Sequence, residues 1–201
     1  MKDKNAVTRR SENRTQALIL AAYHLLAEKG FEGLRLWEVA EQVGINHSTL
    51  HHYFPTKEAL VQAVVLYITQ HLAETAIPTG GTPPEQLHEH LHKLLHHIQQ
   101  EPELFVALNE IGLRAQRDPA IRTTARLREE EWRMFLVNTL QEGIKQGMWP
   151  EDLDSQAVSF AIMALMKSIS VLPPQGAEQA VQQLERWLMG TAVKEERKSD
   201  R

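Results

Sequence analysis

Apolar residues recur along this chain at the spacing of an α-helix. Leu18, Ala22 and Leu25, for example, stand at positions i, i+4 and i+7, which places them on one face of a helix. The alternation of polar and apolar residues that marks a half-buried strand is hard to find. Because the helical spacing extends over most of the sequence, the chain is predicted to be all-α.

Glycine, proline and capping residues divide this pattern into about nine helical segments. Gly30 follows the first segment where a C-terminal glycine is expected, and Asn46 precedes the third segment as an N-cap. Thr82 and Glu85 flank two prolines in the pattern of a capping box that opens the fifth segment. The predicted helices span residues 13–29, 36–43, 47–54, 57–75, 83–101, 103–116, 118–146, 157–171 and 177–189, and residues 194–201 are predicted to be a disordered charged tail.

The composition excludes several classes of protein. The 201 residues are 42% hydrophobic and include no cysteine, which excludes disulfides, thiolate metal sites and a cysteine nucleophile. Apolar runs are shorter than the roughly 18 residues of a membrane span, and the first residues lack the apolar stretch of a signal peptide. We therefore expect a cytoplasmic protein without a membrane partner.

Charge is distributed unevenly along the chain, whose net charge is −4. Residues 1–60 hold 8 Lys and Arg against 7 acids, whereas the remaining residues hold 14 against 19. A basic front section on an acidic body suits a polyanionic partner. An ordinary charged terminus explains the same numbers, so charge alone leaves the partner undecided.

Residues 36–54 contain two short helical segments joined by a glycine turn. A helix-turn-helix needs a small residue where its helices cross and a glycine between them, and Ala40 and Gly44 occupy these positions. The positions expected to be buried carry Val39, Val43, Ile45, Leu50 and Tyr53. This pattern predicts a helix-turn-helix.

The sequence on either side of this motif resembles the DNA-binding domain of TetR-family transcriptional regulators. Gly30-Phe31-Glu32-Gly33 precedes the motif, and Leu50-His51-His52-Tyr53-Phe54-Pro55-Thr56-Lys57-Glu58-Ala59-Leu60 closes and follows it. The resemblance is close over residues 15–65 and rests mainly on helix lengths beyond them. It implies a DNA-binding domain at residues 1–56, with a basic arm at 1–12, and a ligand-binding and dimerisation domain at 57–193.

The resemblance implies that the third helix enters the major groove of a double-stranded DNA operator. The residues then expected to face the DNA are Asn46, His47, Ser48, His51 and His52. Phosphate contacts are expected from Thr49, Tyr53 and Lys57. Arg35 stands where the family usually has a capping hydroxyl, and it is expected to reach a phosphate instead. Trp37 stands where an arginine is common. It either packs against the first helix or lies near the DNA backbone, and we expect the packing.

A two-fold operator needs a two-fold protein, so the resemblance also implies a homodimer on a palindromic site. The predicted interface is a four-helix bundle of the last two helices and their copies, formed by Phe160, Ala161, Ala164, Leu165, Leu184 and Leu188. Periodicity alone leaves open that these helices are internal core. A small apolar ligand is expected to release the DNA, and the residues expected to line its site are Phe105, Leu108, Leu113, Trp132, Phe135, Met163 and Met166.

The histidines at 88, 90, 92, 96 and 97 raise the question of a metal site. His88, His92 and His96 stand at i, i+4 and i+8 and share a helix face, a spacing that can bind zinc, copper or nickel. Without cysteine or an assignable acidic partner, they are interpreted as a solvated polar edge, and no metal is predicted.

Three classes of function therefore compete. A helical adaptor of the same fold would act mainly through a protein partner. An enzyme is disfavoured because neither a nucleophile nor a phosphate-binding loop is recognisable. We expect a ligand-responsive repressor that is not an enzyme and needs no cofactor.

Overall fold

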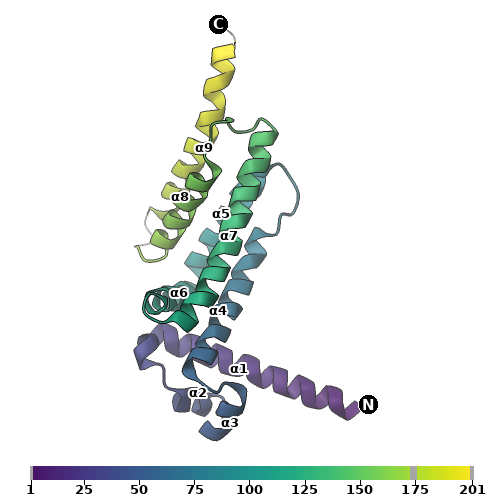
Figure 1. Cartoon of the computed structure of the whole chain (residues 1–201), viewed down its shortest axis with the longest axis vertical. Coiled ribbons are helices and arrows are strands. Elements are labelled where there is room, and N and C mark those ends of the chain that lie inside the picture. Colours follow the sequence, from purple (N-terminus) through teal and green to yellow (C-terminus); the bar gives the residue numbers. More distant parts are fainter. Residues whose placement is uncertain (1, 173–175, 200–201) are drawn as a thin grey trace. The chain divides into compact units, whose positions relative to one another are not determined.

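The computed structural model describes residues 2–172 and 176–199, with side chains placed for 11–172 and 176–188. Within these residues every regular element is helical, which confirms the predicted all-α fold (Figure 1). The helices are α1 (Lys2–Gly33), α2 (Leu36–Gln42), α3 (His47–Tyr53), α4 (Lys57–Ala73), α5 (Pro83–Gln100), α6 (Pro102–Ala115), α7 (Pro119–Lys145), α8 (Ser155–Ile169) and α9 (Ala177–Ser199), with a 3-10 turn η1 (Glu74–Ala76) after α4.

Most predicted helix ends lie close to the observed ones, and the two chain ends differ most. The predicted break after residue 29 is present, because Gly30 leaves the helical conformation (φ 67°, ψ 177°). That left-handed φ is one that glycine adopts without steric cost. At the far end α9 continues to Ser199, where the sequence predicts a disordered tail. Residues 194–198 are Lys, Glu, Glu, Arg and Lys, which are strong helix formers as well as charged.

The chain divides into two compact units. Unit 1 comprises residues 1–71 and 103–127, and unit 2 comprises residues 72–102 and 128–201. Unit 1 therefore contains α1, α2, α3, most of α4, α6 and the first part of α7. The predicted basic arm spans residues 1–12, and the side chains of its residues 1–10 lie outside the described residues, as do those of the predicted tail at 194–201.

Each unit has a buried apolar core. In unit 1 the first four helices supply most of it, including Leu18, Leu26, Leu50, Leu60 and Ile68, and Leu34 adds to it from between α1 and α2. In unit 2 the core is formed by α5, α7, α8 and α9 together with Trp149, and it includes Leu91, Leu136, Leu140, Ile162, Met166 and Val181. These cores hold the helices whose exposed faces carry the candidate sites.

Candidate nucleic-acid interface

The helix-turn-helix in unit 1 turns at Gly44, where φ is 69°. The turn is closed by backbone hydrogen bonds from the Gly44 amide to the Glu41 carbonyl at 3.0 Å and from the Ile45 amide to the Ala40 carbonyl at 2.9 Å. Val39 and Leu50 are buried on either side of the turn. α2 and α3 contact each other, and α2 also contacts α1 (Figure 1). The predicted motif is therefore present, and α3 is supported from behind by core residues.

Asn46 caps α3, as the sequence predicts. Its Oδ1 accepts hydrogen bonds from the Thr49 amide at 2.7 Å and from the Ser48 hydroxyl at 2.8 Å. A cap of this kind satisfies an amide that the first turn of a helix leaves unpaired. Asn46 and Ser48 are exposed, while Thr49 and Tyr53 are half-buried. The start of α3 is thus both anchored and open to solvent.

The three histidines of α3 are all exposed. The His51 Nδ1 lies 3.1 Å from the Pro55 carbonyl oxygen. Since a carbonyl only accepts, Nδ1 carries the proton in this contact, and among the described residues Nε2 has no hydrogen-bond partner. The rings of His47 and His51 meet edge to face with centroids 4.5 Å apart. In the described part of the chain, His52 makes no hydrogen bond, ion pair or ring contact. The exposed surface of α3 therefore carries imidazole nitrogens that have no hydrogen-bond partner among the described residues.

Lys57 contacts α1. Its Nζ donates to the Phe31 carbonyl oxygen and lies 4.3 Å from the centroid of the Phe31 ring. The Arg114 guanidinium lies 4.4 Å from the centroid of the same ring. Burial lowers the pKa of Lys57, the expected direction for a partly desolvated ammonium group. The phosphate contact expected of Lys57 stays a prediction, and the observed contacts link the start of α4 to the end of α1.

Two residues near the start of α2 are exposed. Arg35 occupies the N-cap position without a side-chain capping bond, and its side chain is exposed as a phosphate contact would require. The prediction that Trp37 packs against the first helix is wrong, because its side chain is 58% exposed. The position lies only one residue beyond the start of α2, where an indole need not enter the core. The alternative, that Trp37 lies near the DNA backbone, stays a prediction.

A junction between α6 and the end of α1 was also not predicted. The Glu110 Oε2 accepts a hydrogen bond from the Phe31 amide at 3.3 Å. A Cβ at Gly30 would lie 3.0 Å from the same oxygen, so the glycine makes room for this carboxylate. The Arg114 guanidinium lies 3.2 Å from Glu32 and 3.4 Å from Asp118. These contacts fix the segment that precedes α2, and only its Gly-rich sequence hinted at a close approach.

The residues predicted to line a ligand site divide between the two units. Phe105, Leu108 and Leu113 belong to unit 1, where Phe105 is buried and Leu113 is exposed. The residues in unit 2 are Trp132, Phe135, Met163 and Met166, all of them buried or half-buried. Their role as ligand contacts stays a prediction.

His90 contradicts the interpretation of its segment as a solvated edge, because its side chain is buried in unit 2. The Trp132 indole Nε1 donates to the His90 Nε2 at 2.8 Å. Nδ1 therefore carries the proton and donates to the Thr75 hydroxyl at 3.1 Å, which in turn donates to the Leu72 carbonyl at 2.6 Å.

Burial lowers the pKa of His90 to about 4. Protonation would also set two donors, His90 Nε2 and Trp132 Nε1, against each other. The position was recognisable from the sequence, since residue 90 stands three residues after Leu87 and four before Leu94, on the apolar face of the helix.

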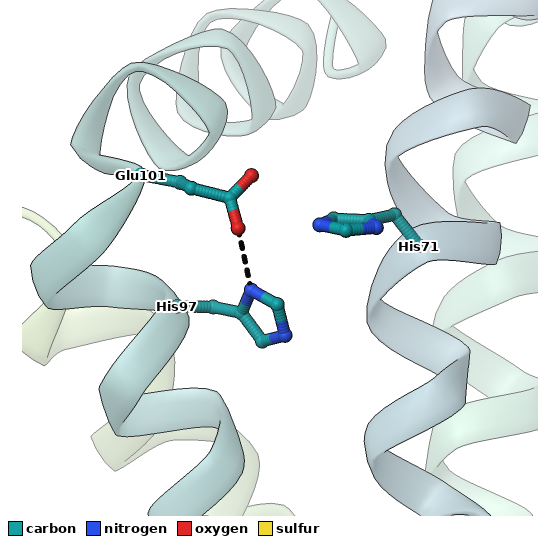
Figure 2. Close-up of side chains that lie close together, drawn as sticks. All are labelled: His71, His97 and Glu101. Atoms are coloured by element: carbon teal, nitrogen blue, oxygen red, sulfur yellow. Dashed lines mark hydrogen bonds and ion pairs between the residues drawn. The ribbon is translucent and has the colours of Figure 1, made fainter.

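The other histidines of α5 lie nearer the surface and pair with carboxylates. The His88 Nδ1 is 2.9 Å from the Glu185 Oε1, and the His92 Nε2 is 3.3 Å from the Glu185 Oε2. Figure 2 shows the His97 Nδ1 bonded to the Glu101 Oε1 at 2.7 Å, at the end of α5. His96 is exposed. One helix therefore holds histidines in several different environments.

The predicted dimer residues also lie in different environments. On α8, Phe160, Ala161 and Ala164 are exposed, and Phe160 is the most open at 71%. Leu165 is half-buried, whereas Leu184 and Leu188 on α9 are buried in the core of unit 2.

No helix of the described residues combines the length and apolarity that crossing a bilayer requires.

Comparison with known proteins identifies the motif. The family model described as bacterial regulatory proteins, tetR family, matches residues 18–64, which span the helix-turn-helix and the helices on either side of it. The chain is a TetR-family transcriptional regulator. Among curated relatives, the HTH-type transcriptional regulator UidR of Escherichia coli K12 is 24% identical to this TetR-family chain over 167 residues, which are 80% of this chain and 81% of UidR.

Solved structures extend the likeness beyond the motif. A TetR transcriptional regulator from Chloroflexus aurantiacus superposes with a TM-score of 0.80 at 18% identity, covering 89% of this chain and 96% of the other. AibR, solved in complex with isovaleryl coenzyme A and operator DNA, superposes with a TM-score of 0.70 at 19% identity, covering 88% and 98%. At these identities the structures establish the TetR-family fold.

Proposed function

We propose that this chain is a repressor that binds a palindromic DNA operator as a homodimer and is released by a small, apolar ligand. The observation that carries the proposal is the exposed face of α3 with Asn46, His47, Ser48, His51 and His52, anchored from behind by the buried Leu50. AibR, a structural neighbour, was solved in complex with isovaleryl coenzyme A and operator DNA. That structure supports the proposal that this fold can bind both DNA and a small ligand. Binding to bacterial DNA would place the protein in the cytoplasm.

The proposed DNA contacts divide into bases and backbone. Imidazole nitrogens, the Ser48 hydroxyl and the Asn46 amide donate or accept hydrogen bonds, as reading the major groove requires. Arg35, Thr49 and Tyr53 are proposed to hold phosphate oxygens, which fix the position of the helix without reading sequence. Lys57 is proposed to hold a further phosphate oxygen from the first turn of α4, and its contact with Phe31 links α4 to α1.

The proposed dimer uses the exposed face of α8. Ala157, Phe160, Ala161 and Ala164 are exposed and stand at helical spacing on one side of this helix. The small alanines allow a helix of a second copy to approach closely. Phe160, whose side chain is 71% exposed, would remove the most apolar surface from water when a second copy covers it. The buried Leu184 and Leu188 support this face from inside unit 2.

The proposed ligand acts through unit 2. Trp132 and Phe135 contact the buried His90, with ring centroids 6.2 Å and 4.8 Å from the imidazole. An apolar ligand among such residues releases DNA only if it binds the DNA-incompetent state more tightly than the competent one. The fluorescence of Trp132 is therefore expected to change with any ligand that dissociates the operator.

Selection of bound sequences from a random pool of DNA duplexes tests the proposed repressor. We expect enrichment of a palindromic site, whose affinity falls about tenfold in His52→Ala, a loss within the usual range for one base contact. His96→Ala is the matched control, because His96 is an exposed histidine on α5. If no sequence is enriched over the pool, the repressor is ruled out and the helical adaptor becomes the better hypothesis.

The dimer is tested separately by Phe160→Glu. An unpaired charge in a covered apolar interface costs several kcal/mol, so this variant is expected to be a helical monomer with weakened operator binding. Met134→Glu is the control, since Met134 is also an exposed apolar residue of unit 2, at 52%. Light scattering that reports dimers for Phe160→Glu would mean that the interface is elsewhere.

A further inference from the structure

His88, His92 and Glu185 form a cluster on the surface of unit 2 that the DNA-binding function does not use. His88 and His92 stand one turn apart on α5, and their ring centroids are 4.1 Å apart. Glu185 reaches both rings from α9, with one carboxylate oxygen 2.9 Å from the His88 Nδ1 and the other 3.3 Å from the His92 Nε2. The two helices contact each other directly. We propose that these three side chains bind a divalent transition-metal ion of the Zn²⁺ class.

The spacing of the donor atoms suits such an ion. The three candidate ligand atoms, one from each residue, lie within 4.8 Å of one another. Zinc bonds to imidazole nitrogen and carboxylate oxygen are about 2.0–2.2 Å long, which sets neighbouring ligand atoms of a tetrahedral site about 3.3 Å apart. The observed nitrogen–oxygen separations of 2.9 and 3.3 Å are already close to that value. The three groups therefore already lie near one another, as a zinc site requires.

The ligand types favour the same class of ion. Two imidazoles and one carboxylate make up a ligand set that zinc uses with a fourth position left to water. Imidazole suits zinc, copper and nickel, whereas magnesium and calcium prefer oxygen ligands only. Because two of the three ligand atoms are nitrogens, the site favours a transition metal over magnesium or calcium.

Charge supplies an independent reason for a cation at this place. The Glu185 side chain is only 20% exposed, so its carboxylate is partly removed from water. Within the described residues its ion-pair partners are His88 and His92, and it has no Lys or Arg partner. The nearby Lys93 ammonium instead pairs with Glu89 at 2.7 Å. A divalent ion bound by the same three groups would place positive charge directly on this carboxylate.

A bound ion would link α5 to α9. Glu185 is 97 positions beyond His88 in sequence, so an ion held by both joins helices that an unfolded chain does not bring together. Metal that binds only the folded protein raises its melting temperature. This consequence concerns unit 2 alone and holds whether or not the chain binds DNA.

The experiment titrates Zn²⁺ into the full chain without a histidine tag, in competition with a chelator of known affinity. We expect the wild type to bind Zn²⁺ and to melt at a higher temperature in its presence. Glu185→Gln keeps the size of the side chain and removes one ligand charge, and His92→Gln removes one nitrogen. Each should weaken binding at least tenfold, because even the loss of a residue behind a metal ligand weakens binding about 10–100-fold.

His96→Gln is the matched control, since His96 is an exposed histidine of the same helix and lies outside the cluster. It should bind Zn²⁺ like the wild type. Co²⁺ serves as the spectroscopic probe, and its visible absorption should weaken in Glu185→Gln. The proposal is overturned if the wild type does not bind Zn²⁺, or if Glu185→Gln binds it as tightly as the wild type. Should His92→Gln fail to fold, Glu185→Gln still decides the result.

Discussion

The histidines of α3 and those of α5 differ in what the fold does with them. α3 carries three histidines, all exposed, and within the described residues only the ring of His51 is hydrogen bonded, to the carbonyl of Pro55. α5 carries five histidines, of which His90 is buried in a hydrogen-bonded chain and His88 and His92 contact Glu185. The residue type is the same, and the neighbours supplied by other helices differ.

This comparison shows how surroundings assign a role to a titratable side chain. An exposed histidine ring with a nitrogen that has no partner in its own unit can bind an external partner, here proposed to be DNA. A ring surrounded by apolar side chains is held neutral, as the pKa of about 4 for His90 illustrates. A ring beside a carboxylate is a candidate metal ligand. Substitutions on the two helices should therefore have different effects on stability and on binding.

The largest difference in stability is expected between His90→Ala and His52→Ala. His90→Ala leaves a cavity and deprives the indole of Trp132 and the hydroxyl of Thr75 of a buried partner. Together these losses should lower the free energy of unfolding by about 4 kcal/mol. His52→Ala, an exposed change, should alter it by less than about 0.5 kcal/mol. Urea denaturation of both variants measures this difference, and equal stabilities would contradict the contrast between the helices.

The pH dependence of stability sharpens the same contrast. The folded pKa of His90 is about 4, below the reference value of about 6.5 for the unfolded chain. Between these values the unfolded chain binds a proton that the folded chain does not, so the stabilisation is present above about pH 6.5. It is lost as the pH falls towards 4 and amounts to about 3 kcal/mol.

This contribution is isolated by comparing denaturation curves of the wild type and of His90→Gln at pH values of about 7.5, 6.0, 5.0 and 4.0. These pH values span the folded pKa of about 4 and the unfolded pKa of about 6.5. Other groups titrate in both proteins and cancel in the difference. We expect the wild type to lose more stability than the variant on acidification. Parallel curves would mean that His90 is not the group responsible.

A smaller effect is expected from Asn46, whose side chain caps α3. Asn46→Ala should cost about 1 kcal/mol of stability, the usual loss when a helix cap is removed. Asn46→Ser restores a hydroxyl cap and should recover most of that stability. If Asn46 also contacts a base, Asn46→Ser should bind the operator more weakly than the wild type even though its stability is restored. A variant that is normal in both assays would restrict Asn46 to capping.

The all-α fold and the helix-turn-helix follow from local patterns. Helical spacing, the cap at Asn46 and the glycines at 30 and 44 each act within a few residues, so sequence reasoning located the breaks between most helices. The residues expected to face outward from α3 came instead from the resemblance to the TetR family. The extension of α9 to Ser199 was not predicted, because charged helix formers also occur in disordered tails.

Contacts between distant segments could not be read from local patterns. Glu110 meets the Phe31 amide across 79 positions, and Lys57 contacts the same residue across 26. Trp37 was expected to pack against the first helix, and its side chain is 58% exposed. Apolar character indicates that a residue tends to be buried, whereas the arrangement of helices decides whether a surface is there to bury it.

The sequence by itself determined that the chain forms helices, that a helix-turn-helix lies near its start and that polar residues face outward from α3. Only the tertiary structure decided which histidines of α5 are buried, paired or exposed. The absence of a recognisable acidic partner had left the metal interpretation without support, and the fold supplies Glu185 from α9. The physical reason is that helical periodicity describes one helix at a time, whereas ligand sets and pKa shifts arise where several helices meet.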